Sequence, residues 1–540
     1  MKKIKQLLGI ILSVSLAIGI VGCGQTSGKG DSTTGDTSKK ILRFAETNPK
    51  NSLDMQTNTS SKVAVISDHV TESLLRYDED LNLIPVLIKD MPTVSEDGLV
   101  YSFELKEGIK FHNGETLKSS DVKFTFERMF TPTTGALSTY NYDMIKGAKE
   151  MLAGAATTLE GFKIIDDTKF EITLAQPYAP FISNLAISYA EIFPEAATKE
   201  AGDNWGITTL IGTGPYKLKE NNQDTGVTLV KNEEYHGGVP NLDEIQVKYI
   251  DDVNTQLLEY EKGNIDVVGL DATLYKNYSE NEEFKDELNE YHSLSTTFLN
   301  TNNADEILGN QKVREALSYA VNRDEIANYL LNGTVTPAKA FLNSAIPGFN
   351  EDAKDYEYNV EKAKALLAEA GYANGVELTA TVSSADGKAS QLFTAIQAQA
   401  KEAGFDIKIE SMDAASFNQK KKDGELQLYL SSWSGLYPDG DHYMYAYLFS
   451  ENTKTKSLNY NNPEFDELMT KARVSTDETE RAKLYKQADE IATREDFAVI
   501  PLYNQSSYFL AKPYVENMKV GNLIYHFFDV DINTELLNEK

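Results

Sequence analysis

The segment of residues 428–449, LYLSSWSGLYPDGDHYMYAYLF, carries the side chains best suited to hold a small organic ligand. It contains Trp433, one of only two tryptophans in the chain, among five tyrosines. Asp439 and Asp441 place carboxylates beside these rings, and a buried ammonium needs such a carboxylate for compensation. Aromatic residues at this density also occur in hydrophobic cores, so the segment indicates either binding or packing.

Catalytic patterns are missing from the sequence. Hydrolysis needs a nucleophile with its base, or a metal cluster, yet no H-E-x-x-H pair, G-x-S-x-G turn or G-x-x-x-x-G-K-[ST] loop occurs. Carboxylate pairs such as Asp166-Asp167 are expected by chance among 82 acidic residues. We therefore predict no enzymatic activity, no cofactor and no metal site. The histidines are scattered along the chain, at His69, His112, His236, His292, His442 and His526.

Length and charge narrow the class of protein further. A chain of 540 residues is too long for one hydrophobic core and predicts two or more domains. The net charge of −30 argues against binding to nucleic acid, because phosphate contacts need clustered lysines and arginines. A single cysteine excludes disulfides and zinc sites made of several thiolates.

The first forty residues predict secretion and a lipid anchor. Residues 1–22 have a lysine-rich start and an apolar run that is short for a membrane span, as in a signal peptide. The run ends at IVGC, which resembles the lipobox of bacterial lipoproteins, so Cys23 is the predicted site of acylation. Residues 23–40 are rich in glycine, serine and threonine and indicate a flexible tether.

Mixed helices and strands are expected after the tether. The alternating apolar residues of LVYSFELKEG predict a strand, followed by a turn at Asn113-Gly114 and a helix capped by Ser119 or Ser120. Two further helices are predicted in VREALSYAVNRDEIANYLLNG, ended by Gly333, and another in NVEKAKALLAEAG. The order of VELTATVSS, a helix and FDIKIESMD predicts a partly parallel sheet.

These segments resemble, in order, those of the family 5 extracellular solute-binding proteins of ABC importers, which bind oligopeptides, dipeptides or nickel. The most specific match is FELKEGIKFHNGETLKSSDVKFTFERM, and IGTGPYKL, VREALSYAVNRDEI and NYNNPEFDELM follow it. The resemblance implies an α/β fold like that of periplasmic binding proteins, with two lobes, a hinge and an extra domain inserted in the first lobe. The hinge strands are expected near SLSTTFLNTN and AVIPLYNQSS.

The resemblance also implies domain boundaries. Lobe I would comprise residues 41–80, 205–292 and 505–540, the inserted domain residues 81–204, and lobe II residues 293–504.

The resemblance assigns ligand-binding candidates to both lobes. In peptide-binding relatives a G-W-x-x-D-Y loop lines the cleft, and its aspartate pairs with the amino terminus of the peptide. The corresponding candidates here are Ser432, Trp433, Ser434, Leu436 and Tyr437. The segments that match cleft residues of the first lobe contribute Thr59, Ser60, Ser61, Tyr140 and Tyr142.

Leu436 departs from this pattern, since it stands where relatives have the aspartate. Either Asp439 or Asp441 then meets the ammonium of the ligand, or the ligand has no free amino terminus there. A nickel-chelate binder is the alternative within the family. Few arginines are available for an anionic chelate, and none lies between Arg128 and Arg314.

The implied partners are a short peptide, two permease subunits and an ATPase. We expect a monomer, anchored by its lipid on the outer face of the cell membrane, or on the periplasmic face if a second membrane is present. The alternative from another functional class is a peptide sensor that takes no part in transport. A permease operon next to the gene would distinguish an importer component from such a sensor.

The substitution Cys23→Ser tests the predicted anchor. It removes the acylation site while leaving the folded lobes intact, because the residue precedes the tether. The protein should leave the membrane fraction or accumulate as unprocessed precursor, which fractionation and mass spectrometry of the chain would show. Unchanged fractionation with normal processing would contradict the lipoprotein prediction.

Overall fold

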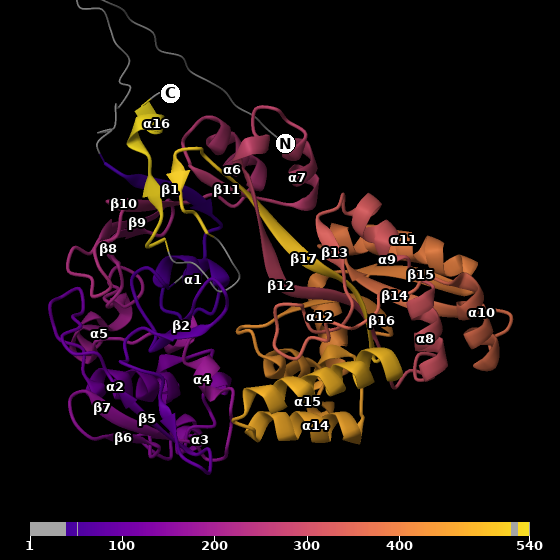
Figure 1. Ribbon diagram of the computed structural model, residues 1–540, viewed down its shortest axis with the longest axis horizontal. Helices are drawn as coiled ribbons and strands as arrows, with labels where there is room; N and C mark the ends of the chain where they lie inside the picture. Colours follow the sequence, from indigo (N-terminus) through magenta and orange to yellow (C-terminus); the bar gives the residue numbers. More distant parts are fainter. Residues whose placement is uncertain (1–38, 51, 520–526, 539–540) are drawn as a thin grey trace, which may run out of the picture. The chain divides into compact units, whose positions relative to one another are not determined.

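The computed structural model describes residues 39–50, 52–519 and 527–538, in which helices and strands are mixed along the chain (Figure 1). The predicted signal peptide, residues 1–22, and the lipidation site Cys23 lie outside the described residues, as does nearly all of the tether. Among the residues described, no helix combines the length and apolar character needed to cross a bilayer.

One mixed sheet runs through most of the described chain. It has eleven strands in the order β15-β14-β16-β12-β17-β11-β1-β10-β9-β8, and β13 pairs with β17 off this path. Its strands are β1 (Ile41–Glu46), β8 (Tyr216–Asn222), β9 (Gly226–Lys231), β10 (Glu244–Tyr249), β11 (Val267–Leu270), β12 (Leu288–Thr301), β13 (Val335–Pro337), β14 (Val376–Ser383), β15 (Phe405–Met412), β16 (Leu428–Ser434) and β17 (Val499–Ala511). The predicted parallel pairing of β14 with β15 is confirmed.

The long strands β12 and β17 lie side by side in Figure 1 and join the two halves of this sheet. They pair antiparallel from Leu288 opposite Leu510 to Asn300 opposite Val499. Their register shifts between His292 and Thr296, within one of the two predicted hinge segments. Such an irregularity bends a strand locally. The hinge itself stays a prediction.

A separate four-stranded sheet lies within the predicted inserted domain, in the order β4-β5-β7-β6. Tyr101 and Phe103 point their rings into the core from β5, as the alternating pattern predicted, and Phe103 stacks on Phe170 at 4.9 Å. One hydrophobic cluster contains residues of this sheet together with residues of β1, β8, β9 and β10. The strands are β4 (Thr93–Val94), β5 (Val100–Glu104), β6 (Phe162–Ile164) and β7 (Lys169–Thr173), and the helices are α2 (Ser119–Phe130), α3 (Ala148–Leu152), α4 (Phe181–Asn184) and α5 (Glu195–Ala201).

The predicted cap of α2 is wrong by one or two positions. Lys118 is the N-cap, and Ser119 is already the first helical residue. The reason is a carboxylate in the first turn, since Asp121 accepts a hydrogen bond from the backbone N–H of Lys118 at 3.0 Å. The side chain of Asp121, the third helical residue, therefore fixes the start of α2, and neither serine is the cap.

The second half of the chain follows the predicted helix signals closely. Asn359 caps α10 through a hydrogen bond from the N–H of Lys362, and Gly371 follows the helix with φ +92°. Gly333, with φ +74°, ends the turn after α9 as expected. The helices are α8 (Gln311–Tyr319), α9 (Arg323–Glu325), α10 (Val360–Glu369), α11 (Gly387–Glu402), α12 (Ala414–Asp423), α13 (Ala446–Leu448), α14 (Pro463–Val474) and α15 (Glu478–Glu490).

The remaining α-helices and strands are short. They are α1 (Ser61–Ser67), α6 (Val253–Glu261), α7 (Ala272–Ser279) and α16 (Thr534–Asn538), with the strand pairs β2 (Leu75–Tyr77) and β3 (Leu83–Pro85), and β18 (Val515–Glu516) and β19 (Asp531–Ile532).

A buried ion pair ties the first strand of the sheet to distant segments. Asp266 is fully buried, and its carboxylate accepts hydrogen bonds from Arg43 Nη2 at 2.7 Å and Arg43 Nε at 3.1 Å. The same carboxylate accepts the backbone N–H of Arg43 at 2.6 Å and the hydroxyl of Tyr514 at 2.8 Å. The carboxylate of Asp266 therefore links its own segment to those of Arg43 and Tyr514.

The substitution Asp266→Ala is expected to lower the free energy of unfolding by about 3 kcal/mol, because it leaves a guanidinium and a backbone N–H without their partner. Denaturant unfolding followed by circular dichroism measures the change. Glu282→Ala is the control, since its pair with Lys285 is exposed and should contribute less than about 1 kcal/mol. Equal effects of the two substitutions would contradict the assigned role of Asp266.

Candidate functional site

A cavity of about 640 Å³ brings together residues that lie far apart in the sequence. One part of its wall comes from residues 140–189 and includes Tyr140, Tyr178, Asn184 and Tyr189. The other part comes from residues 433–473, which contain the aromatic segment singled out above. Of the predicted ligand-binding residues, the wall contains Tyr140, Trp433, Ser434, Leu436, Tyr437 and Asp441.

The end of β16 positions Trp433. This strand pairs antiparallel with β12, placing Trp433 opposite Thr296 and Ser432 opposite Thr297. The indole N–H of Trp433 donates to the carbonyl of His442 at 2.9 Å, and the indole ring stacks on the imidazole at an interplanar angle of 20°. Ser432 is exposed and bonds to Thr297 at 2.7 Å instead of lining the cavity.

The loop after β16 has glycine at two positions, Gly435 and Gly440, where a side chain would clash with a tyrosine ring. A Cβ at Gly435 would lie 2.4 Å from the ring of Tyr443, and one at Gly440 would lie 2.5 Å from the ring of Tyr485. Glycine therefore lets both rings pack directly against the backbone of the loop. Tyr443 in turn donates its hydroxyl to the carbonyl of Leu294 on β12 at 2.6 Å.

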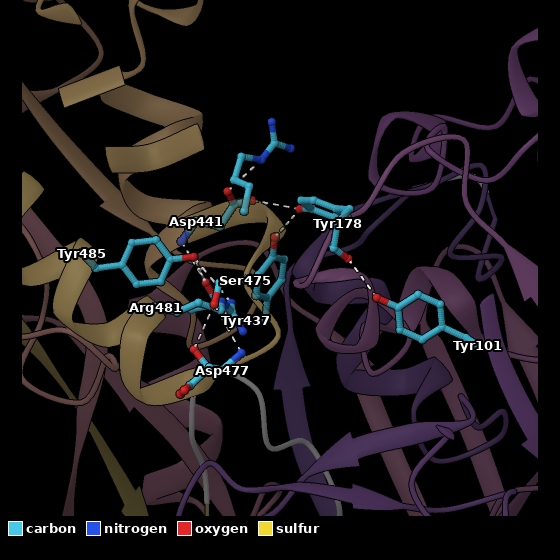
Figure 2. A network of polar contacts seen from close by, with 10 residues as sticks. Tyr101, Tyr178, Tyr437, Asp441, Ser475, Asp477, Arg481 and Tyr485 are labelled. Carbon is cyan, nitrogen blue, oxygen red and sulfur yellow. Dashed lines mark hydrogen bonds and ion pairs between the residues drawn. The ribbon is translucent and has the colours of Figure 1, made fainter. Parts of the chain in front are cut away.

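Both aspartates of this loop already have arginine partners, as Figure 2 shows for part of the network. Asp439 pairs with Arg481 and accepts the hydroxyl of Tyr485 at 2.8 Å. Asp441 lies 3.0 Å from Arg473 Nε and accepts the hydroxyl of Tyr178 at 2.9 Å. Asp441 borders the cavity, whereas Asp439 lies behind its wall. Each carboxylate therefore has an arginine as its ion-pair partner, although Asp441 Oδ1 and Arg473 Nε do not meet the geometry of a hydrogen bond.

Tyr178 connects the first half of the chain to this loop. Its hydroxyl lies 3.2 Å from that of Tyr437, and its ring contacts the guanidinium of Arg473, which also lies over Tyr445 at 3.5 Å from the ring centre. Burial raises the pKa of Asp441 to about 6, although the positive charge of Arg473 acts in the opposite direction. Sequence reasoning missed Tyr178 and Arg473, since neither stands near the aromatic segment in the chain.

The candidates from the first half of the chain have different environments. Tyr140 is 62% exposed and borders the cavity, whereas Tyr142 is fully buried and donates its hydroxyl to the carbonyl of Asn184 at 2.8 Å. Ser60 caps α1 by accepting the N–H of Lys62. Thr59 and Ser61 border a second cavity of about 150 Å³, which shares Leu436 and Tyr189 with the first.

Asn184 is a further polar group that sequence reasoning missed. It is 1% exposed, it borders the larger cavity, and its amide nitrogen donates to the carbonyl of Asn141 at 2.8 Å. Its Oδ1 has no donor within the part of the chain that the structure describes. A buried amide oxygen without a partner is costly, so this atom suits an N–H group of a ligand.

The histidines within the described residues form no metal cluster. In the described part of the chain, no three histidine, cysteine, aspartate or glutamate residues cluster closely enough to hold a metal ion. His442 borders the cavity, but its Nδ1 accepts the backbone N–H of Leu436 at 3.3 Å, and burial lowers its pKa to about 4. The ring Nε2 of His112 lies 2.9 Å from the carbonyl oxygen of Gly214.

Comparison with known proteins identifies the class of protein that this fold and cavity define. Residues 82–455, more than half of the chain, match the model of the bacterial extracellular solute-binding proteins, family 5. The chain belongs to this family, whose members serve ABC importers as solute-binding proteins.

Individual relatives cover most of the chain. The dipeptide-binding protein DppE of Bacillus subtilis is 27% identical over 97% of this chain and 98% of its own. Heme-binding protein A of Haemophilus influenzae is 28% identical over 79% of this chain and 80% of its own. The structure of the ABC transporter-associated periplasmic binding protein DppA of Helicobacter pylori, in complex with the peptide STSA, superposes with a TM-score of 0.72 at 25% identity, covering 91% of this chain and 98% of that one.

The family confirms two of the predictions made from the sequence. The two-lobed α/β fold of periplasmic binding proteins is that of the structural neighbours. Solute-binding proteins of ABC transporters are not enzymes, so the predicted lack of catalysis agrees with the family. The family also places the protein outside the cytoplasm, in the periplasm or at the cell surface.

Tryptophan fluorescence tests whether Trp433 contacts ligand. Trp205 is 5% exposed and packs edge-on against Phe193 at 5.2 Å, so it should not respond to binding. Titration with a pool of short peptides is expected to change the emission of wild type and Trp205→Phe, and to change that of Trp433→Phe much less. An undiminished change in the emission of Trp433→Phe would show that Trp433 does not contact the ligand.

Proposed function

We propose that this protein captures short peptides in the larger cavity and delivers them to the permease of an ABC importer. The observation that carries the proposal is the cavity of about 640 Å³, bordered by Tyr140, Tyr178 and Tyr189 on one side and Trp433 on the other. Its volume falls in the range of about 300–1,000 Å³ usual for ligand sites. The dipeptide-binding relatives support a peptide as the ligand.

The chemistry of the wall suits a peptide of variable sequence. Aromatic faces stack on side chains of many kinds, and the orphaned Oδ1 of Asn184 accepts an N–H group of the peptide backbone. Peptides in extended conformation gain affinity from main-chain hydrogen bonds, and Ser434 at the end of β16 places backbone beside the cavity. Water filling the remaining volume would tolerate different side chains.

The wider arrangement is part of the same proposal. The protein works as a monomer, held by a lipid on Cys23 at the outer face of the cell membrane, or on the periplasmic face where a second membrane is present. Two permease subunits and an ATPase are its partners. The residue pattern IVGC and the family support this arrangement. A peptide sensor without transport would use the same cavity and lack the permease.

A nickel chelate fits the cavity less well. An anionic chelate needs a free cation, and Arg473, the arginine in the cavity wall, is already paired with Asp441. His442 cannot offer Nδ1 to a metal while that atom accepts the N–H of Leu436. Both contacts favour the peptide over the chelate.

Ligand identification tests the proposed function directly. Native mass spectrometry of protein purified without a tag should show a heterogeneous set of bound peptides, and calorimetry should show binding of defined di- to hexapeptides. A mixture of nickel and histidine should give no heat. Tight binding of that mixture with no heat from any peptide would overturn the proposal in favour of the chelate.

The substitution Asn184→Ala should weaken peptide binding by about fivefold, the loss of one neutral hydrogen bond worth about 1 kcal/mol. Asn221→Ala is the matched control. Its Oδ1 is also without a donor and its amide nitrogen donates to the carbonyl of Ile207 at 2.8 Å, but it does not border the cavity. Calorimetry compares the two variants. Equal losses would show that Asn184 acts on the fold and not on the ligand.

A further inference from the structure

The wall of the larger cavity contains few ionisable groups besides its tyrosines. Among the described residues they are Asp143, Asp441, His442 and Arg473. A free peptide brings an ammonium and a carboxylate of its own, and a buried charge needs a partner of opposite sign. These four groups therefore determine which charged part of a peptide the cavity can hold.

Three of the four groups already have partners within the protein. Arg473 Nε lies 3.0 Å from Asp441 Oδ1, and the other oxygen of Asp441 accepts the hydroxyl of Tyr178 at 2.9 Å, as Figure 2 shows. Burial keeps His442 neutral by lowering its pKa to about 4, and its Nδ1 accepts the N–H of Leu436. The part of the wall that follows β16 therefore offers a ligand no unpaired carboxylate among its described residues.

Asp143 is the exception. Its carboxylate accepts no hydrogen bond from the described residues, and its side chain is 38% exposed. Its ion-pair partner is Lys149, whose Nζ lies 3.9 Å away on a side chain that is 74% exposed. Ion pairs that are long and exposed contribute little to stability. The carboxylate of Asp143 is therefore accessible and can exchange this contact for a better donor.

The backbone on both sides of this carboxylate is held in place. The buried Tyr142 donates its hydroxyl to the carbonyl of Asn184 at 2.8 Å, and the amide nitrogen of Asn184 donates to the carbonyl of Asn141 at 2.8 Å. The carbonyl of Met144 accepts the N–H of Ala175 at 2.8 Å. Binding a ligand would therefore not have to order this segment first, which lowers the cost of binding.

Further acceptors lie in the same part of the wall. An ammonium has three N–H groups, so a site for it needs more than one acceptor. Asn184, whose Oδ1 has no donor among the described residues, is bonded to the backbone two positions before Asp143. Tyr140, three positions before Asp143, borders the cavity with an exposed ring and adds a hydroxyl.

The electrostatics of Asp143 agree with a missing partner. Partial burial raises the pKa of Asp143, although the positive charges of Lys149 and Arg473 act in the opposite direction. These two cations do not make up for the lost hydration of the carboxylate. A cation bound beside Asp143 would stabilise its ionised form.

We propose that Asp143 receives an ammonium group of the bound peptide, in place of the aspartate that was expected where Leu436 stands. This inference rests on the proposed function. Asp143 and Leu436 belong to different parts of the cavity wall, so the peptide lies with this ammonium toward residues 140–189 and not toward the loop after β16. The ammonium comes either from the amino terminus of the peptide or from a lysine side chain.

The test compares one lysine-containing peptide in matched forms by calorimetry. The forms are the free peptide, its N-acetylated version, and a version in which norleucine replaces lysine. For wild type, removing the ammonium that meets Asp143 should weaken binding about tenfold. Asp143→Asn should reduce this ratio to near one, because asparagine keeps the shape and loses the charge. Asp143→Glu should restore most of the ratio, because it returns the carboxylate.

Asp352→Asn is the matched control. Asp352 also has a distant lysine partner, since Lys486 Nζ lies 3.7 Å from its carboxylate, but it does not border the larger cavity. This variant should keep the wild-type ratio. Equal losses in Asp143→Asn and Asp352→Asn would reflect the general acidity of the chain and would overturn the inference.

Ratios of affinities separate ligand charge from any loss of folding, because each variant is compared only with itself. If wild type binds every form of the peptide equally, the inference is overturned while the proposed function stands. If Asp143→Asn keeps the full ratio, the ammonium lies elsewhere and the inference is wrong. If no peptide binds to wild type, the proposed function fails and the inference fails with it.

Discussion

The antiparallel pairing of β12 with β17 is the constraint on which the rest of the structure depends. Buried backbone N–H and C=O groups need hydrogen-bond partners. In the middle of the large sheet, β12 and β17 satisfy each other's groups, and this pairing joins the two halves of the sheet. β12 also pairs with β16, so its register decides where Trp433 lies. A slip of one residue would turn the indole to the opposite face of the sheet. The aromatic wall of the cavity is thus a consequence of strand register.

Charge is distributed unevenly around the two cavities. The loop after β16 holds its aspartates in pairs with Arg473 and Arg481, and breaking such a buried pair leaves a desolvated charge. These pairs shape the loop and leave it electrically neutral. Among the described residues Glu191 forms no ion pair, and burial together with the neighbouring Asp68 raises its pKa, so the wall formed by the first half of the chain favours a protonated carboxyl there.

Local features were predictable from the sequence, and contacts across long separations were not. The cap at Asn359, the glycine after α10 and the alternation in β5 depend on neighbouring residues, and each was found as expected. The hydrogen bond from Tyr178 to Asp441 spans 263 positions, and no periodic pattern in the sequence predicts it. Tyr142 shows the same limit, since a residue matched to cleft aromatics is fully buried here. The packing of the folded chain decides which aromatic rings border the cavity and which lie in the hydrophobic core.

The imidazole of His442 has a consequence for the environment in which this protein works. Burial keeps the ring neutral above about pH 4, and its Nδ1 accepts the N–H of Leu436 in that state. Protonation would replace an acceptor with a donor and break this contact. A protein outside the cytoplasm meets medium whose acidity the cell does not buffer. The contact between His442 and the N–H of Leu436 should therefore persist through mild acidification, whereas Asp441 in the same loop, with its pKa raised to about 6, is the group that responds first.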